Sequence, residues 1–461
     1  MSEIKNKENP LGYERIPKLL GKFALPSVVA MLVSSFYNVV DQIFIGQYVG
    51  PIGNAATNIA FPVTTICMAI ALLVGIGGAS RFSIELGKGD KEEARECVGN
   101  AVWSALILGT LYAVIAGIFA EPMLNVFGAT EGALPYALDY VNVIVIGIPF
   151  LILSNVISNF IRADGSPNFS MICMIIGAVI NTVLDAVFVA DWGLNMGMKG
   201  AAIATVISQI ISFVVAASYL FRFKTVKLKL NKFTFNIAKS IKIASLGTSN
   251  SLNQVAICAV QITMNNSLAH YGALSIYGED IPIAAFGVVM KVNSILMAIF
   301  IGIAQGTQPI IGFNYGARQF DRSKAVCKIA SAICFTCAAV GTLMFQFFPE
   351  YILAVFGSGD ALYMEFAVKT MRTFLMFIML NSMQLIFANY FSAIGKPIKG
   401  VILSMSRQFL LIIPLMLILP LFFELNGILY AAPITDFTSF IISIIFILRE
   451  FRLPEYKKQN I

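Results

Sequence analysis

The sequence contains few charged residues. Only 12% of its 461 residues are Asp, Glu, Lys or Arg, whereas an average soluble protein has about 25%, and 58% are hydrophobic. So few charges cannot cover a water-exposed surface, which excludes a soluble globular protein. A transmembrane β-barrel is also excluded, because its strands alternate over only about ten residues and the apolar runs here are much longer.

Residues that usually carry catalysis or bind metals are scarce as well. The chain has one histidine, His270, which is too isolated to form a metal site. Cys334 and Cys337 form a C-x-x-C pair inside an apolar run, and one such pair does not provide four metal ligands. We find no nucleophile–base motif, so we expect neither an enzyme nor a bound cofactor. The net charge of +7 comes from short loops, and we expect no nucleic-acid partner.

Long apolar runs are abundant, and each run of about 20 residues or more marks a membrane helix. Twelve such runs predict an all-α membrane protein with twelve transmembrane helices in two six-helix bundles. They lie at about residues 18–44, 56–80, 97–120, 138–162, 168–190, 200–222, 243–270, 283–312, 326–348, 370–394, 398–420 and 427–449.

Lysine and arginine alternate between successive loops, which predicts the orientation of the chain. They are frequent in both tails and near residues 81–95, 222–242 and 318–328, but absent from 45–55, 121–137 and 271–282. Positive loops face the cytoplasm. We therefore expect a multi-pass protein of the plasma membrane (the inner membrane of a bacterial cell) with both termini in the cytoplasm.

The two halves of the sequence resemble each other at an offset of about 230 residues. The segment EPMLNVFGAT (121–130) matches PEYILAVFGSG (349–359), and FIRADGSP (160–167) matches YFSAIGKP (390–397). Each half holds six spans, so both copies insert the same way up and a pseudo-two-fold axis is expected along the membrane normal. The predicted domains are an N-terminal bundle (1–222), a basic cytoplasmic linker (223–242) and a C-terminal bundle (243–461).

Polar residues inside the N-terminal spans are candidates for the transport chemistry, because a charge there costs about 2.5–3.5 kcal/mol. Asp41, Asp185 and Thr205 lie at one depth, near the outer ends of their spans. Asn181 is one helical turn from Asp185. Two carboxylates, an amide and a hydroxyl at one level would form a proton-binding pair or an oxygen cage for a small cation such as Na⁺. The alternative is that the two acids only cap helix ends or form a hydrogen bond with a neighbouring serine.

The C-terminal half has no acidic residue at the positions that correspond to Asp41 and Asp185, and carries Lys291, Arg407 and Asp436 instead. Arg407 and Asp436 share a depth, which predicts a structural ion pair. The alternative is a second coupling site at Asp436, although a neighbouring arginine favours the ionised acid.

Pro26 interrupts the first span, where proline removes a backbone hydrogen bond and permits bending. We predict a hinge that lets the outer half of this span, which carries Asp41, change its path. A static kink is the alternative.

Six motifs in this order resemble the multidrug and toxic compound extrusion (MATE) transporters. The resemblance extends over nearly the whole chain, is closest to the MepA-like group, and in its acidic pair is similar to the DinF-like branch. The motifs are FYNVVDQIFIG (36–46), FIRADGSP (160–167), NTVLDAVFV (181–189), GMKGAAIAT (197–205), QPIIGFNYGA (308–317) and NYFSAIGKP (389–397).

The resemblance implies two bundles that form a V and cation-driven export of amphipathic, cationic organic compounds. In DinF-like members the residues that match Asp41, Asn181, Asp185 and Thr205 form the cation site. Another branch has acidic residues in the C-terminal bundle, near Met264 and in the tenth span, and this chain lacks them. We expect the lipid bilayer and small amphipathic substrates as partners, and a monomer.

Two other functions remain alternatives. A flippase for lipid-linked precursors would belong to the same superfamily, but such proteins usually have extra spans and a cationic cavity. An ion channel would need filter segments, which we do not find. Whether the coupling ion is H⁺ or Na⁺ stays open, because a buried carboxylate pair suits both.

Overall fold

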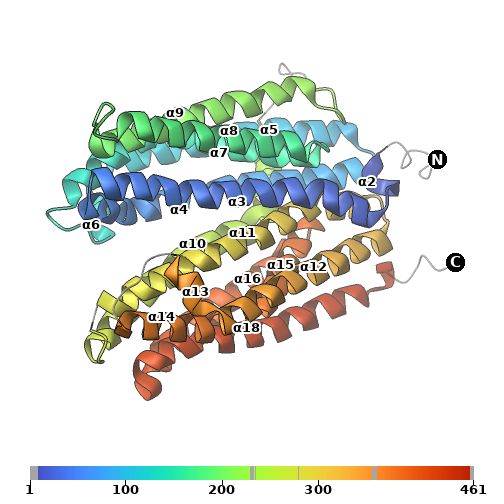
Figure 1. The fold of residues 1–461 in the computed structure, drawn as a ribbon. Coiled ribbons are helices and arrows are strands. Elements are labelled where there is room, and N and C mark those ends of the chain that lie inside the picture. Colours follow the sequence, from blue (N-terminus) through green and yellow to red (C-terminus); the bar gives the residue numbers. More distant parts are fainter. Residues whose placement is uncertain (1–8, 229–232, 234, 279, 356–360, 457–461) are drawn as a thin grey trace.

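The structure, a computed structural model, describes residues 9–228, 233, 235–278, 280–355 and 361–456, and this part of the chain is helical without strands. The helices divide into two groups, which we call the N-lobe and the C-lobe (Figure 1). The N-lobe comprises α2 (Pro10–Tyr13), α3 (Ile16–Tyr48), α4 (Pro51–Lys88), α5 (Lys91–Ile118), α6 (Ala120–Val126), α7 (Leu134–Ala163), α8 (Pro167–Phe188), α9 (Gly197–Ser218) and the 3-10 turn η2 (Tyr219–Arg222).

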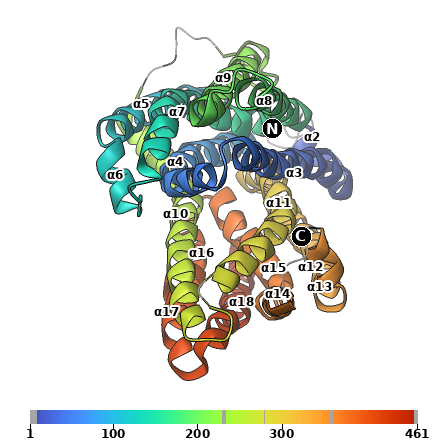
Figure 2. The same cartoon turned by 60° about the vertical axis from the view of Figure 1, so that its left-hand side comes forward.

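The first helix of the C-lobe starts at Ile237, within the segment predicted as the linker (223–242). The C-lobe comprises α10 (Ile237–Ala273), α11 (Asp280–Gly316), α12 (Phe320–Phe347), α13 (Pro349–Ala354), α14 (Ala361–Phe374), α15 (Ile378–Ala393), α16 (Pro397–Met405), the π-helical segment η4 (Ser406–Ile412), α17 (Ile413–Ile418), α18 (Pro420–Phe451) and the 3-10 turn η5 (Pro454–Tyr456). Figure 2 shows the same two groups of helices from another side.

The predicted all-helical membrane fold with two bundles is confirmed. Within the described residues, ten helices are long and apolar enough to cross a membrane, and an eleventh span is the pair α14 and α15. Their axes differ by 48°, so the span predicted at 370–394 is bent. The remaining predicted span, at 243–270, lies in α10, which is 37 residues long but richer in polar residues.

The turn between α4 and α5 illustrates how the sequence ends one helix and starts the next. Gly89 follows α4 with φ +82°, a left-handed conformation that glycine adopts without steric cost. Asp90 then caps α5, because its side chain accepts a hydrogen bond of 2.9 Å from the backbone N–H of Glu93. The turn therefore places an acidic helix start at the end of the molecule that also holds both chain termini (Figure 1).

We call this end the termini side, and the two lobes contact each other there. Gly302 and Gly306 of α11 lie against the backbone of α3 at Val28 and Ala24. The side chain of Gln308 donates hydrogen bonds to the Ile76 carbonyl (2.9 Å) and to Ser80 Oγ (2.7 Å) of α4. These contacts involve the first half of α3 and the second halves of α4 and α11.

The distribution of the apolar core agrees with contact between the lobes at the termini side. One core cluster runs from Val74 and Phe82 of α4 into Ile243 of α10 and Phe313 of α11. A separate cluster around Leu124 lies wholly within the N-lobe, toward the opposite side. In Figure 1 the lobes diverge toward that side, which carries α6 and α13. The molecule is therefore V-shaped, as the family resemblance implies.

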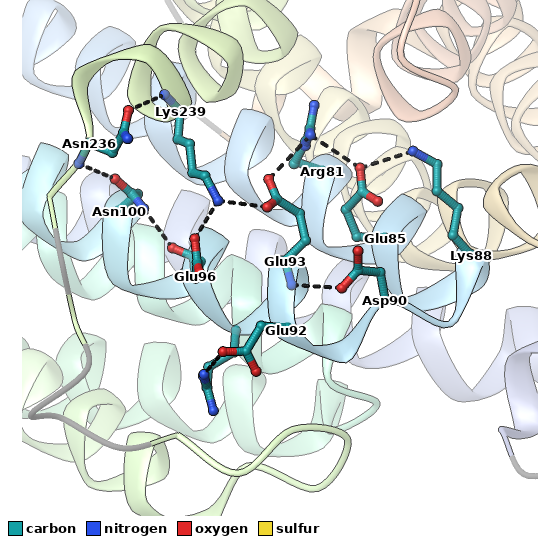
Figure 3. Close-up of polar contacts among 11 residues, drawn as sticks. Arg81, Glu85, Lys88, Asp90, Glu92, Glu93, Glu96, Asn100, Asn236 and Lys239 are labelled. Atoms are coloured by element: carbon teal, nitrogen blue, oxygen red, sulfur yellow. Dashed lines mark hydrogen bonds and ion pairs between the residues drawn. The ribbon is translucent and has the colours of Figure 1, made fainter.

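A polar network at the termini side joins the start of α10 to the N-lobe (Figure 3). Lys239 forms ion pairs with Glu93, at 2.6 Å, and with Glu96 of α5. Glu93 also contacts Arg81 of α4 at 3.3 Å. The backbone N–H of Asn236 donates to Asn100 Oδ1 at 2.7 Å. The first turn of the first C-lobe helix is thus held by N-lobe side chains.

Candidate functional site

Three helices of the N-lobe bring the four predicted cation-site residues together. Helix α3 packs against α8, and α8 packs against α9. Asp41 lies on α3, Asn181 and Asp185 lie one turn apart on α8, and Thr205 lies on α9. All four lie in the half of the N-lobe that is away from the termini side. We call this set the acidic site.

Asn181 links the two neighbouring helices of the acidic site. Its amide lies between Asp185 and Thr205, and one orientation satisfies both of its polar atoms. In that orientation Nδ2 donates to Asp185 Oδ2 at 2.9 Å, and the amide oxygen accepts from the backbone N–H and the hydroxyl of Thr205, both at 3.3 Å. An amide orientation is assigned from such a network of hydrogen bonds. Asn181 therefore fixes the position of the Asp185 carboxylate.

The carboxyl groups of Asp41 and Asp185 lie within hydrogen-bonding reach of each other. Asp185 is fully buried and Asp41 is partly buried. One oxygen of each, Oδ1, is enclosed without a hydrogen-bond partner in the part of the chain that the structure describes. Buried polar atoms are nearly always hydrogen-bonded, so two unpartnered oxygens on neighbouring carboxylates indicate a place for a further ligand.

The acidic site also lacks a compensating basic side chain. Among the described residues, no lysine, arginine or histidine forms an ion pair with Asp41 or Asp185. Two carboxylates in contact in a low-dielectric interior repel strongly when both are ionised. A bound proton would remove this repulsion, and so would a bound cation.

Sequence reasoning missed two tyrosines beside the acidic site. Tyr37 lies one turn before Asp41 on α3, close enough to interact electrostatically with both acids. Tyr140 of α7 has its hydroxyl beside Thr205. The spacing of Tyr37 from Asp41 could have revealed the first. The second becomes visible only when α7 is packed against α9. Each tyrosine provides a hydroxyl group near the site.

The structure also brings Arg407 and Asp436 together, in the C-lobe. Arg407 Nη2 lies 2.9 Å and Nε 3.0 Å from Asp436 Oδ1, and Asp436 is only 3% exposed. Arg407 belongs to the π-helical segment η4, a local widening of the helix that is frequent at functional positions. Lys291, the other predicted charge in this lobe, is exposed on α11 and does not contact this pair.

Pro26 is buried within α3, which continues as one helix from Ile16 to Tyr48. The backbone contacts of Gly306 with Ala24 and of Gly302 with Val28 lie on either side of it along the helix. The part of α3 around Pro26 is therefore held against the C-lobe. The part that carries Asp41 lies beyond these contacts.

The chemistry of the acidic site suits a proton or a hard monovalent cation. Carboxylate, amide and hydroxyl oxygens suit hard cations, whereas thiolate and imidazole suit softer metals. Within the described residues, no group of three or more His, Cys, Asp or Glu side chains could hold a metal ion. The donor oxygens of Asp41, Asn181, Asp185 and Thr205 could hold Na⁺, and the two carboxylates alone suffice for a proton.

Comparison with known protein families gives one match. The family model described as MatE matches residues 26–187 and 252–418. The multidrug export protein MepA of Staphylococcus haemolyticus (strain JCSC1435) is 27% identical over 433 residues, which cover 91% of this chain and 90% of that protein. MepA of Staphylococcus aureus (strain MRSA252) is 25% identical and covers 92% of each.

Solved structures resemble the whole chain as well. The MATE multidrug transporter DinF-BH, solved in complex with rhodamine 6G, superposes with a TM-score of 0.87 and 34% sequence identity, over 97% of this chain and 98% of that chain. The outward-facing conformation of a multidrug resistance MATE family transporter of the MOP superfamily gives a TM-score of 0.87 at 24% identity, over 94% of this chain and 96% of that chain. The latter likeness shows the fold alone.

Proposed function

Because this chain belongs to the MATE family of membrane transporters, we propose that it is a secondary active antiporter that exports amphipathic, cationic organic compounds in exchange for H⁺ or Na⁺. The acidic site is the coupling site of this exchange. The rhodamine dye bound in the DinF-BH structure is a suitable first substrate to test. The protein works as a monomer with an N-lobe, a cytoplasmic linker and a C-lobe.

One observation carries the proposal: Asp41 and Asp185 lie close enough to interact directly, and each has a buried oxygen that lacks a partner within the described chain. An unpaired buried charge costs several kcal/mol, so the empty and fully ionised site is unfavourable. A cation relieves this cost at the acidic site, where Asn181 and Thr205 supply further oxygens. Occupation of the site therefore changes the free energy of the surrounding helices.

Coupling requires that cation and substrate favour different states of the protein. A ligand that binds both states equally shifts nothing. Asp41 lies on the part of α3 beyond the α11 contacts, and Pro26 lies between the glycines that make them. Neutralisation of Asp41 then permits α3 to bend at Pro26, which lowers the affinity for substrate and releases it to the outside. Binding of substrate from the cytoplasmic side requires the opposite change, in which Asp41 loses its cation and α3 straightens.

The orientation of the transporter follows from its charges. The basic loops at residues 81–95 and 318–328 lie at the termini side, and positive loops face the cytoplasm. The contact between the lobes then closes the cytoplasmic side, and the V opens to the outside. The protein has both termini in the cytoplasm.

The coupling site is tested with purified protein in liposomes. An imposed pH or Na⁺ gradient, at a clamped membrane potential, drives transport of the rhodamine dye by the wild type. Asp41→Asn and Asp185→Asn each reduce this transport at least about a hundredfold, and the double variant is hardly slower than either single one, because the pair acts as a unit. Asp191→Asn, which removes an exposed carboxylate outside the site, serves as the control and transports normally.

Equal reconstitution and unchanged thermal unfolding of the variants show that the loss concerns coupling rather than folding. Wild-type rates in both single variants would exclude the acidic site as the coupling site. The gradient that drives the wild type identifies the coupling ion.

A further inference from the structure

A polar cavity lies on the termini side of the N-lobe, away from the acidic site. It has a volume of about 340 Å³ and lies between the first turn of α5 and the segment after η2. At about 30 Å³ for each water molecule, it is larger than a single small ion needs. It is lined by Lys91, Glu92, Arg95, Lys224, Thr225, Val226 and Lys227.

Positive charge dominates this cavity, with four basic side chains against one acidic side chain. Arg95 pairs with Glu92. Within the described chain, Lys91, Lys224 and Lys227 have no ion-pair partner. Figure 3 shows Glu92 on the opposite face of α5 from Lys239. The acidic residues on the Lys239 face therefore belong to the interlobe network and do not neutralise the cavity.

The segment that carries two of these lysines is fixed in place by a buried carboxylate. Asp164 is 2% exposed and accepts hydrogen bonds from the backbone N–H groups of Lys224 (2.7 Å) and Thr225 (2.9 Å). It also accepts from the hydroxyls of Thr225 (2.5 Å) and Tyr219 (2.8 Å). Val226 is buried beneath the segment. The cavity therefore has an ordered wall, which reduces the entropy cost of binding an anion.

The cavity lies at the depth of the lipid headgroups. Helix α5 has 28 residues and is about 42 Å long, close to the ~40–45 Å thickness of a bilayer with its headgroups. Lys91, its first residue, therefore lies at the membrane surface. Phe221 in η2, three residues before Lys224, has an exposed aromatic side chain (76%).

We propose that this cavity binds the phosphate headgroup of an anionic phospholipid, from the leaflet at the termini side. The phosphate lies between Lys91, Lys224 and Lys227, and the acyl chains extend along the apolar surface of α5. Basic pockets on the cytoplasmic side of membrane proteins bind anionic headgroups in this way. Soluble organic phosphates share the charge of the headgroup but lack the apolar tail.

The proposal is tested by titration of the purified full chain in a mild detergent, with bound lipid counted by native mass spectrometry. Phosphatidylglycerol binds at least about tenfold more tightly than phosphatidylcholine. The variant Lys224→Gln/Lys227→Gln loses about tenfold in affinity for phosphatidylglycerol, because each cation near an anionic surface contributes to binding. The control Lys22→Gln/Lys328→Gln removes two exposed lysines from the same side of the molecule and binds as the wild type does.

Two further measurements identify the source of the phosphate and the place of binding. Glycerol phosphate does not compete with phosphatidylglycerol at millimolar concentration. A photo-crosslinkable anionic lipid labels peptides that contain residues 91–95 or 224–227. Any of four results would overturn the proposal. These are equal binding of both lipids, an equal loss of affinity in the control variant, competition by glycerol phosphate, and crosslinks confined to other segments. None of these outcomes depends on which ion drives transport.

Discussion

At the scale of single residues, the buried acids of the two lobes differ in what neutralises them. Asp436 has Arg407 at 2.9 Å, whereas Asp41 and Asp185 have no basic partner within the described chain and lie beside each other and the polar groups of Asn181. A buried acid with a fixed arginine keeps the same charge in every step of a cycle. An acid pair without such a partner must gain or lose a cation, which is the property a coupling site needs.

This difference predicts opposite effects of neutralisation. Asp436→Asn leaves Arg407 without its partner in the C-lobe interior, and loss of one member of a buried pair costs about 3–5 kcal/mol. We expect a clearly lower unfolding temperature and lower expression, but normal transport per folded molecule. Thermal unfolding of the purified variant and transport of the rhodamine dye in liposomes measure the two quantities.

The matched control is Asp139→Asn, which breaks an exposed pair with Lys199 at 3.2 Å. Exposed pairs contribute about 0–1 kcal/mol, so its unfolding temperature stays near that of the wild type. If Asp436→Asn instead unfolds normally and loses gradient-driven transport, Asp436 is a second ion site and the structural role is wrong.

The sequence predicts most of the acidic site because most of its residues can be recognised from the sequence around them. Asp41 and Asp185 are charges inside apolar runs, and Asn181 shares a helix face with Asp185. Tyr140 was not predicted, since its place beside Thr205 depends on how α7 packs against α9. Likewise, only the packed structure shows that one buried oxygen of each acid lacks a hydrogen-bond partner within the described residues.

At the scale of helices, the apolar pattern predicts spans but not where helices end. The span expected at 283–312 belongs to a helix from Asp280 to Gly316, because a helix continues beyond the lipid while its backbone hydrogen bonds remain favourable. The 48° bend between α14 and α15 and the π-helical turn at Ser406–Ile412 were not predicted. Both depend on tertiary packing, which a hydropathy pattern does not contain.

The contact between α3 and α11 permits a test of how the lobes separate. A Cβ atom on Gly306 would lie 2.6 Å from Ala24 Cα and 2.7 Å from the Phe23 carbonyl oxygen. Such overpacking costs about 1–3 kcal/mol, and it acts only while the termini side is closed. We therefore expect Gly306→Ala to increase the population that is open at the termini side about tenfold. The distance between nitroxide labels at positions 91 and 321, measured by double electron–electron resonance, then becomes longer.

Gly287→Ala is the control for this helix. Gly287 also belongs to α11, but a Cβ there meets no atom within 4 Å, so the variant gains the same helix propensity without the clash. Identical distance distributions for the two variants would show that the glycine contact does not hold the closed state.

At the scale of the whole molecule, the internal duplication predicted from the sequence is visible as equivalent elements. The first repeated segment forms the short helix α6 between α5 and α7, and its counterpart contributes α13 between α12 and α14. The second segment ends α7 and begins α8, and its counterpart ends α15 and begins α16. The repeats match because each turn needs the same local chemistry, such as Gly165 and Gly395, both at positive φ.

The even number of spans in each lobe predicts that the basic loops of both lobes lie on the same side of the membrane. In a background without the seven native cysteines, a cysteine at the exposed position 222 reacts with a membrane-impermeant thiol reagent only after the cells are opened. A cysteine at the exposed position 194, in the loop between α8 and α9, reacts in intact cells. The reverse pattern would invert the topology and the direction of transport, while leaving the fold unchanged.

The V shape described above also has a mechanical consequence. A protein whose halves meet at one end and diverge at the other has unequal cross-sectional areas in the two halves of the bilayer (Figure 1). In the proposed antiport, rocking of the lobes about their contact would reverse this inequality, so the change from one state to the other includes work against the lateral pressure profile of the membrane. The intrinsic curvature of the surrounding lipids thereby enters the equilibrium between the two states, alongside the cation and the substrate.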